Sequence, residues 1–392
     1  MQRSDDTGPG IGGTRTGPLA GLRVVEFLGI GPGPFCGMLL SDMGADVLLV
    51  ERPQASQAAY SVPRRMDVLL RGRRSLTLDL KEPEDARVAL ALAGRADALI
   101  EGFRPGVMER LGLGPDVVLG SNPKLVYGRV TGWGQDGPLA ARAGHDINYI
   151  ALSGVLNAIG RASGAPVPPL NLIGDFGGGG MLLAFGMVCA LLEARQSGRG
   201  QVVDAAMVDG ASLLATMIYG LRSAGSWSDM RGQNLLDTGA PWYDVYQTKD
   251  GGYVSIGAIE PQFYTELLDR LDIAGENLPD QYDRAGWPQL RMRFEAIFSS
   301  RTRNEWSEAF DGADACFAPV LSFDEASRHP HNTARQAFLS DGGTLVPAPA
   351  PRFSRTPARA PGTAPQPGSG GPSTLVEWGF SSAEVEALGL RS

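Results

Sequence analysis

The sequence predicts an α/β fold, with a parallel sheet in a large domain and a smaller α+β domain after it. Three observations predict it. The 392-residue chain is long enough for two domains. Short apolar, β-branched segments alternate with helical stretches along its first third, a pattern typical of a doubly wound sheet. After about residue 205 the pattern changes to a hairpin signal followed by further helices.

The first predicted unit is strand, helix, strand. Residues 22–30, LRVVEFLGI, are apolar and β-branched and end near a glycine, so they predict a buried strand. Residues 34–45 have helical spacing, and residues 46–52, DVLLVER, predict a second strand. Two parallel strands joined by a helix almost always form a right-handed crossover, so we expect this unit to begin a parallel sheet.

The alternation continues to residue 134. Residues 82–95 carry acidic side chains at their start, which favours a helix. Residues 181–192 form a 12-residue apolar stretch. A membrane span needs roughly 20 residues, so this stretch predicts a buried helix. The other elements of this part are predicted strands at 75–80, 96–103 and 124–134 and a short predicted helix at 106–113.

The second half of the chain has a different pattern. Residues 240–260 contain two alternating stretches around KDGG, which predict a β-hairpin, and helical stretches follow it. Residues 341–373 are rich in proline, glycine and alanine and predict an extended connector. A last helix follows, with Ser381 and Glu384 spaced as a capping box.

The composition argues against several classes of protein. The 43 acidic and 35 basic residues give a formal net charge of −8, which disfavours general nucleic-acid binding. Cys36, Cys189 and Cys316 are too far apart for a disulfide framework or a metal motif, so we expect a reducing compartment. Residues 1–16 lack the apolar run of a signal peptide and predict a disordered tail. We expect a soluble, cytoplasmic protein with no membrane or nucleic-acid partner.

The turn after the first strand, GIGPGP at residues 29–34, resembles a dinucleotide-binding fingerprint. Glu51 lies at the end of the second strand, 20 residues after Gly31, where such sites place an acid. Pro32 and Pro34, however, remove two backbone N–H groups that a pyrophosphate needs. We therefore favour a tight strand-to-helix turn over NAD binding.

Residues 69–81, LLRGRRSLTLDLK, are rich in cations. Arg71, Arg73, Arg74 and Lys81 suit a phosphorylated ligand, and they equally suit a solvated surface strand. A phosphate-binding patch would extend to Arg104 and Arg110.

Three titratable residues have unusual neighbours. His145 is one of only three histidines and lies in AGHDINYIALSG. Asp175 precedes Gly177–Gly180 and is either a helix cap or part of a site where bare backbone N–H groups meet developing negative charge. Glu260 directly precedes Pro261 at a strand-to-helix transition, and its alternative role is a helix-start acid stabilised by the helix dipole. The three could perform two-sided acid/base chemistry, although spacing alone does not bring them together.

Several long motifs carry a resemblance to a known family: GPLAGLRVVEFLGIGPGPFCGMLLSDMGADVLLVERP, GFRPGVMERLGLGP, TGWGQDGPLAARAGHDINYIALSG, PPLNLIGDFGGGGM and GAIEPQFY. From about Gly17 to the last helix the chain resembles the racemase branch of the family III CoA-transferase superfamily. Cys36 departs from the family pattern, near the expected coenzyme A side.

The resemblance implies a Rossmann-like large domain completed by the C-terminal segment, a smaller α+β domain and an interlocked homodimer. It also implies no nicotinamide, metal or other cofactor, because coenzyme A is part of the acyl-CoA substrate. The expected divisions of the chain are a tail at 1–16, the large domain at 17–205, a connector helix and linker at 206–240, the small domain at 241–328 and a return segment at 329–392.

The motifs also imply residue roles. His145 and Asp175 match paired acid/base residues, and Glu260 matches the acid that supports the histidine. The expected reaction inverts the 2-methyl centre of a branched 2-methylacyl-CoA through an enolate, stabilised by backbone N–H groups at the start of the 175–195 helix. The alternative is a CoA-transferase with Asp175 as nucleophile. The residues that match acyl-CoA contacts are Arg52, Leu78, Asp79, Leu80, Lys81, Gly102, Phe103, Arg104, Arg110, Gly144, Asp146, Ile147, Asn148 and Tyr149.

Overall fold

The computed structural model describes residues 16–53, 62–341, 343–358 and 362–389. The chain forms two compact units. The large unit comprises residues 1–149, 171–214 and 336–392, and the small unit comprises residues 150–170 and 215–335. The predicted tail at 1–16 lies outside the described residues except for Thr16.

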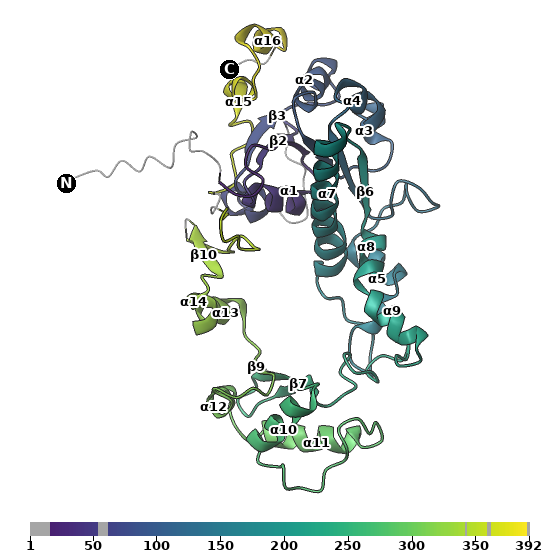
Figure 1. Ribbon diagram of the computed structural model, residues 1–392, viewed down its shortest axis with the longest axis vertical. Coiled ribbons are helices and arrows are strands. Elements are labelled where there is room, and N and C mark those ends of the chain that lie inside the picture. Colours follow the sequence, from purple (N-terminus) through teal and green to yellow (C-terminus); the bar gives the residue numbers. More distant parts are fainter. Residues whose placement is uncertain (1–15, 54–61, 342, 359–361, 390–392) are drawn as a thin grey trace, which may run out of the picture. The chain divides into compact units, whose positions relative to one another are not determined.

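The large unit contains a parallel sheet of six strands in the order β3-β2-β1-β4-β5-β6. Figure 1 labels β2, β3 and β6 of this sheet. β1 pairs in parallel with both β2 and β4, so the strand order reverses there, and ligands of such sheets bind beyond the carboxyl ends of the strands at that point. This confirms the predicted doubly wound fold. The strands are β1 Arg23–Phe27, β2 Asp46–Glu51, β3 Arg74–Thr77, β4 Ala98–Glu101, β5 Val126–Thr131 and β6 Val202–Ala206.

Helices cover both faces of this sheet. On one face, α1 (Pro32–Asp42) and α7 (Leu182–Ser197) contribute Leu40, Leu183 and Met187 to one apolar core. The other face is covered by α2 (Pro83–Ala93), α3 (Val107–Arg110), α4 (Pro115–Ser121) and the C-terminal helices α15 (Gly371–Glu377) and α16 (Ser382–Ala387).

The C-terminal segment returns to the large unit. Leu375 and Trp378 are fully buried in the core beneath α2, and the Trp378 indole N–H donates to Asp46. The predicted capping box is present, because the Ser381 side chain accepts from the backbone of Glu384 at the start of α16. The predicted extended connector at 341–373 begins in a strand pair, since β10 (Phe338–Asp341) and β11 (Thr344–Pro347) form an antiparallel pair.

Residues Leu172–Ser197 form one long apolar helix, whose first part, η3 (Leu172–Met181), is π-helical. By length and composition alone it would cross a membrane, and it is less than half buried. One face packs on the sheet. The opposite face is exposed along Met181, Phe185, Val188 and Leu192, with Phe185 69% exposed. The prediction of a buried helix at 181–192 is therefore right for one face only.

The small unit has its own core. β7 (Tyr243–Gln247) and β8 (Tyr253–Gly257) form the predicted hairpin, and β9 (Phe317–Pro319) adds to β8. Fully buried Trp242, Phe294, Phe298 and Trp306 pack behind this antiparallel sheet. Its helices are α6 (Val155–Ala158), α9 (Thr216–Ser223), α10 (Pro261–Arg270), α11 (Trp287–Phe298), α12 (Arg303–Ala309), α13 (Phe323–Arg328) and α14 (Pro330–Ala334).

The units differ from the expected domains at residues 150–170, which group with the small unit although we expected them in the large domain. Hydrogen bonds explain the grouping: the Arg231 guanidinium donates to the carbonyl oxygens of Asn157, Arg161 and Gly164. The expected connector at 206–240 is likewise divided, since α8 (Met207–Leu214) belongs to the large unit and α9 to the small one.

Candidate functional site

The β1–α1 turn forms one wall of the candidate site. Gly31 precedes Pro32 at the start of α1 and has φ 73°. A Cβ at Gly31 would lie 3.2 Å from the Oδ2 atom of Asp175, so the turn approaches this carboxyl closely. Glu51, the acid expected of a dinucleotide site, is buried and pairs with Arg64. The turn is therefore the tight strand-to-helix connection we favoured.

Asp175 lies in the first turn of η3, and short π-helical segments are often found at functional sites. The glycines that follow it have a packing role. A Cβ at Gly178 would lie 2.7 Å from the backbone nitrogen of Ala211 in α8, and one at Gly180 would lie 2.7 Å from the carbonyl oxygen of Pro32 in α1. The absence of side chains here therefore lets α8 and α1 pack closely against η3. That these glycines also expose N–H groups to a ligand stays a prediction.

The side chain of Asp146 joins the segment of His145 to that of Asp175. Asp146 follows His145 directly and begins α5 (Asp146–Leu152). Its Oδ2 atom accepts the backbone N–H groups of Gly174, at 2.6 Å, and of Asp175, at 2.8 Å. His145, an exposed side chain, is close enough to lower the pKa of the Asp175 carboxyl. The structure therefore brings the two predicted acid/base residues together.

Burial sets the protonation of Asp175. Desolvation is the largest effect and raises the pKa of this half-buried carboxyl. Asn171 opposes it, because its Nδ2 donates to the Asp175 Oδ2 atom at 3.1 Å and favours the ionised form. The Asp146 carboxylate raises the pKa further and His145 lowers it. The net direction is upward, which suits a carboxyl that must hold a proton before donating it.

Tyr149 packs beside this pair. Burial, followed by the charges of Asp175 and Asp146, raises the pKa of its phenol to about 12. Its ring contacts Trp133 edge-on, with centroids 4.8 Å apart, and covers Gly144, where a Cβ would lie 2.7 Å from the ring. Tyr149 is therefore held as a neutral side chain in a fixed position.

The residues expected to contact acyl-CoA divide into exposed and buried groups. Leu78 is 1% exposed in the core, so its side chain faces no ligand, and the buried Asp146 carboxylate is committed to η3. Asp79 and Leu80 are half-buried, as are Phe103 and Gly144, while Gly102, Ile147 and Asn148 are exposed. The exposed cations are Arg52, Lys81, Arg104 and Arg110, which form no ion pair within the described ranges.

The arginines at 71–74 are structural, and the prediction that they bind phosphate is wrong. Arg71 is buried and pairs with Asp42, and Arg73 is buried against Glu26. Arg74 pairs with Asp46 and Glu377. Ion pairs of this kind satisfy the charges that a ligand would need. Cys36 is also structural: its thiol is fully buried, 3.9 Å from the sulfur of Met187, and does not face a ligand.

Glu260 belongs to the small unit. It is exposed, directly precedes α10 and makes no side-chain cap hydrogen bond there. Its charge raises the pKa of the Cys316 thiol, which burial raises most. Its place directly before α10 is that of a helix-start acid stabilised by the helix dipole, so the structure agrees with this alternative and leaves the catalytic role a prediction.

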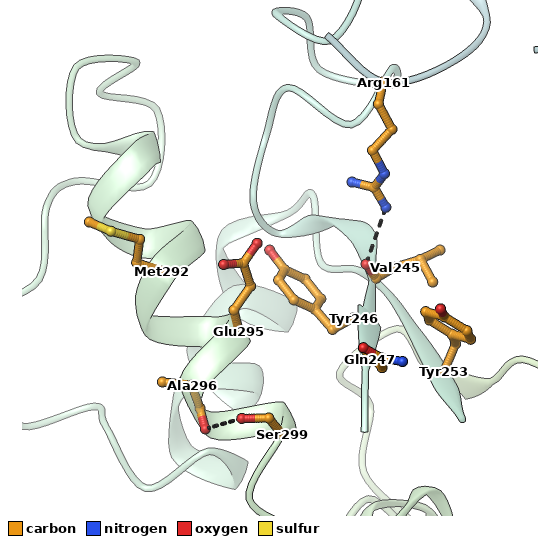
Figure 2. A pocket seen from close by; sticks show the side chains of 9 residues that line it. All are labelled: Arg161, Val245, Tyr246, Gln247, Tyr253, Met292, Glu295, Ala296 and Ser299. Carbon is orange, nitrogen blue, oxygen red and sulfur yellow. Dashed lines mark hydrogen bonds between the residues drawn. The ribbon is translucent and has the colours of Figure 1, made fainter. Parts of the chain in front are cut away.

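A separate cavity of about 750 Å³ lies in the small unit between β7 and α11 (Figure 2). Arg161 reaches over it and donates to the Val245 carbonyl at 3.4 Å. None of the predicted acid/base residues lines it. The lining residues are Arg161, Val245, Tyr246, Gln247, Tyr253, Met292, Glu295, Ala296 and Ser299.

The sequence analysis missed Asn171 and the close approach of Gly31. Asn171 lies four residues before Asp175, and helical neighbours at that spacing share a face, so the spacing was a usable signal. The Gly31 contact joins two segments more than 140 residues apart, and nothing local indicates it.

The doubly wound sheet, with a histidine–aspartate pair beside its first strand-to-helix turn, places the chain among α/β proteins with a candidate acid/base site. The chain belongs to CoA-transferase family III, whose model matches residues 19–370. It is 48% identical over 373 residues to alpha-methylacyl-CoA racemase of Mus musculus, covering 94% of this chain and 96% of the relative. It is 33% identical over 369 residues to the succinyl-CoA–L-malate CoA-transferase beta subunit of Chloroflexus aurantiacus, covering 88% and 90%. A crystal structure of Rv3272 from M. tuberculosis matches with TM-score 0.75 and 28% identity, over 91% of this chain and 98% of that one.

Proposed function

We infer that the chain is an isomerase that inverts the 2-methyl centre of branched 2-methylacyl-CoA thioesters. The observation that carries this inference is the pairing of His145 with Asp175, two different acid/base groups held next to each other by Asp146. The 48% identity to alpha-methylacyl-CoA racemase over nearly the whole chain supports the same reaction.

The reaction is a 1,1-proton transfer. One group removes the α-proton from one face of the thioester, and the other returns a proton to the opposite face of the enolate. An imidazole is the usual side-chain base near neutral pH. The raised pKa of Asp175 favours the protonated form that donates. Each such positioned group typically contributes about 10²–10⁴-fold to the rate.

The enolate oxygen needs hydrogen-bond donors, and the first of those we expected, the N–H group of Asp175, already donates to Asp146. The N–H groups of Gly174 and Asp175 both point at Asp146. The backbone N–H groups of Asp146 and Ile147, at the start of α5, have no acceptor within the described ranges. We therefore propose that these two N–H groups donate hydrogen bonds to the enolate oxygen. Loss of one such donor typically costs about 10²–10³ in rate.

Coenzyme A would be bound through its phosphates. Arg52 follows β2 and Arg104 follows β4, so both lie at the carboxyl edge of the sheet, where ligands of this fold bind. Lys81 and Arg110 are also exposed and unpaired in the described part of the chain. Guanidinium groups match phosphate oxygens in a bidentate geometry, which gives these four cations a shared role.

A second copy of the chain would complete the assembly as an interlocked homodimer. An exposed apolar stripe runs from Met181, at the end of η3, along Phe185, Val188 and Leu192 of α7. It supports this proposal, because apolar patches of this kind usually mark an interface. Glu260 would accept a hydrogen bond from His145 and fix its tautomer, from its own or the partner subunit.

The rival function is CoA transfer with Asp175 as the nucleophile. That scheme needs no second proton-transfer group, so it leaves His145 and Glu260 without a role. Incubation of a single epimer of a 2-methylacyl-CoA with the protein separates the two. Conversion to a near-equal mixture, analysed on a chiral column, supports the racemase. Transfer of CoA to an added carboxylic acid without loss of configuration supports the transferase.

A further inference from the structure

Two polar side chains, those of Asp146 and Asn171, flank Asp175. Asp146 is among the residues expected to contact acyl-CoA, and its backbone N–H is assigned above to the enolate, but its carboxylate faces η3. Asp146 is 4% exposed. Its Oδ2 atom accepts two N–H groups of η3, and its Oδ1 atom is buried with no hydrogen-bond partner within the described ranges. Asn171 is exposed and donates its amide to the Oδ2 atom of Asp175 at 3.1 Å.

These side chains act on the carboxyl of Asp175 in opposite senses. A buried carboxylate beside another acid makes ionisation of the second costly, because like charges repel strongly away from water. An amide N–H that donates to a carboxylate stabilises its ionised form. Asp146 therefore favours the protonated acid, and Asn171 favours the ionised base.

The other charged groups near Asp175 come from the elements around it. His145 directly precedes α5, and the Tyr149 phenol on α5 is close enough for the Asp175 charge to raise its pKa. The elements packed against η3 bring further titratable groups, but none is among those that shift the pKa of Asp175. They are Cys36 and Asp42 of α1, Asp209 of α8, Cys189, Glu193 and Arg195 of α7, Asp204 of β6, and Tyr127 and Arg129 of β5.

We propose that Asp146 and Asn171 are positioning residues that set the protonation of Asp175. Asp146 stabilises the protonated carboxylic acid, and Asn171 stabilises the ionised carboxylate. This inference rests on the proposed function. A racemase needs such a balance, because Asp175 is a base for one epimer and an acid for the other. A nucleophilic carboxylate would need only its ionised form.

The test uses Asp146→Asn, which keeps one acceptor oxygen for η3 and removes the charge, and Asn171→Ala, which removes the donor. The measurement is the acid side of the pH profile of kcat/KM, which reports the essential base of the free enzyme. It is taken with the epimer whose proton Asp175 removes, identified as the epimer whose α-proton exchange is lost in Asp175→Asn. Loss of the Asp146 charge should move this limb to lower pH, and loss of the Asn171 donor should move it to higher pH. Both variants shifting in the same direction, or neither shifting, would overturn the proposal.

A variant that only damages the structure lowers kcat/KM without shifting the acid side of the pH profile. The direction of the shift therefore distinguishes an effect on the protonation of Asp175 from a structural defect. Asn304→Ala, on the exposed surface of α12, is the matched control and should leave the profile unchanged. If Asp146→Asn fails to fold, the exposed Asn171 variant still decides, because an unmoved limb there contradicts the proposal.

A second readout needs no turnover. The carboxyl carbon of Asp175 can be titrated by ¹³C NMR in aspartate-labelled protein, with its signal assigned by its absence in Asp175→Asn. The same opposite shifts are expected. If the two variants shift the Asp175 titration in opposite directions but the protein racemises no substrate, the proposed function is refuted and the roles of Asp146 and Asn171 stand. If the protein racemises its substrate but the titration does not shift in the variants, only the roles of Asp146 and Asn171 are refuted.

Discussion

The Oδ2 atom of Asp146 lies 2.8 Å from the backbone nitrogen of Asp175. This hydrogen bond joins the segment that carries His145 to the helix that carries Asp175, across 29 residues of sequence. One side chain thus fixes the distance between the two groups that would exchange protons with the substrate.

Replacement of Asp146 by Ala should therefore damage both stability and rate. Two N–H groups, on Gly174 and Asp175, would lose their acceptor, and a buried donor left unpaired costs about 1–3 kcal/mol. Urea unfolding should show the lower free energy of unfolding. The value of kcat should fall by a larger factor than KM rises, because His145 and Asp175 would no longer be held at a fixed relative position. Asp146→Asn retains an acceptor oxygen and should lose less stability. Equal stability of the alanine variant and the wild type would refute the structural role.

The two acid/base residues should fail differently. His145→Ala removes the base for one epimer, and Asp175→Asn removes the base for the other while keeping the side-chain shape. Racemisation should fall about 10²–10⁴-fold in both variants, since inversion needs a donor opposite the base. Residual α-proton exchange should retain configuration and favour opposite epimers in the two variants. Wild-type racemisation by either variant would remove that residue from the mechanism.

Substitution of an exposed arginine should affect substrate binding, whereas substitution of an ion-paired arginine should affect stability. Arg104 is exposed and unpaired in the described part of the chain, so Arg104→Ala should raise KM for acyl-CoA with little change in thermal stability. Arg74 is paired with Asp46 and Glu377, so Arg74→Met should lower stability by about 1–3 kcal/mol and leave KM unchanged. A rise in KM in the Arg74 variant but not in the Arg104 variant would contradict this assignment. It would instead support phosphate binding by the arginines at 71–74.

Much of the fold follows from local pattern. The buried strands are short and β-branched, and the helices between them begin at prolines or acids, so the doubly wound sheet and the β7–β8 hairpin are readable from the sequence. The strand β6 escaped prediction, because its first residues are exposed and it carries Asp204 in its centre.

The site is less readable, because charge alone does not show which cations are paired. Arg73 and Arg104 are the same residue type beside similar strands, yet one is buried against Glu26 and the other is exposed. Their partners come from distant segments. The glycines after Asp175 were similarly ambiguous, since close helix packing and ligand approach both require the absence of a side chain.

The exposed stripe on α7 should be covered in solution. Light scattering should give about twice the 41.4 kDa chain mass. Phe185→Asp places a charge in the stripe and should produce monomers with reduced activity. Val117→Asp, on the exposed face of α4, is the control and should remain dimeric. A fully active monomeric wild type at low concentration would contradict the homodimer.

The most direct measurement is α-proton exchange in deuterated water, starting from one epimer of a 2-methylacyl-CoA. Two acid/base groups on opposite faces of an enolate should invert the centre and incorporate one deuterium from solvent in each inverted molecule. The account predicts a near-equal mixture of epimers, both labelled at the α-carbon, from either starting epimer. Recovery of the starting epimer unlabelled, with CoA transferred to an added carboxylic acid, would contradict it.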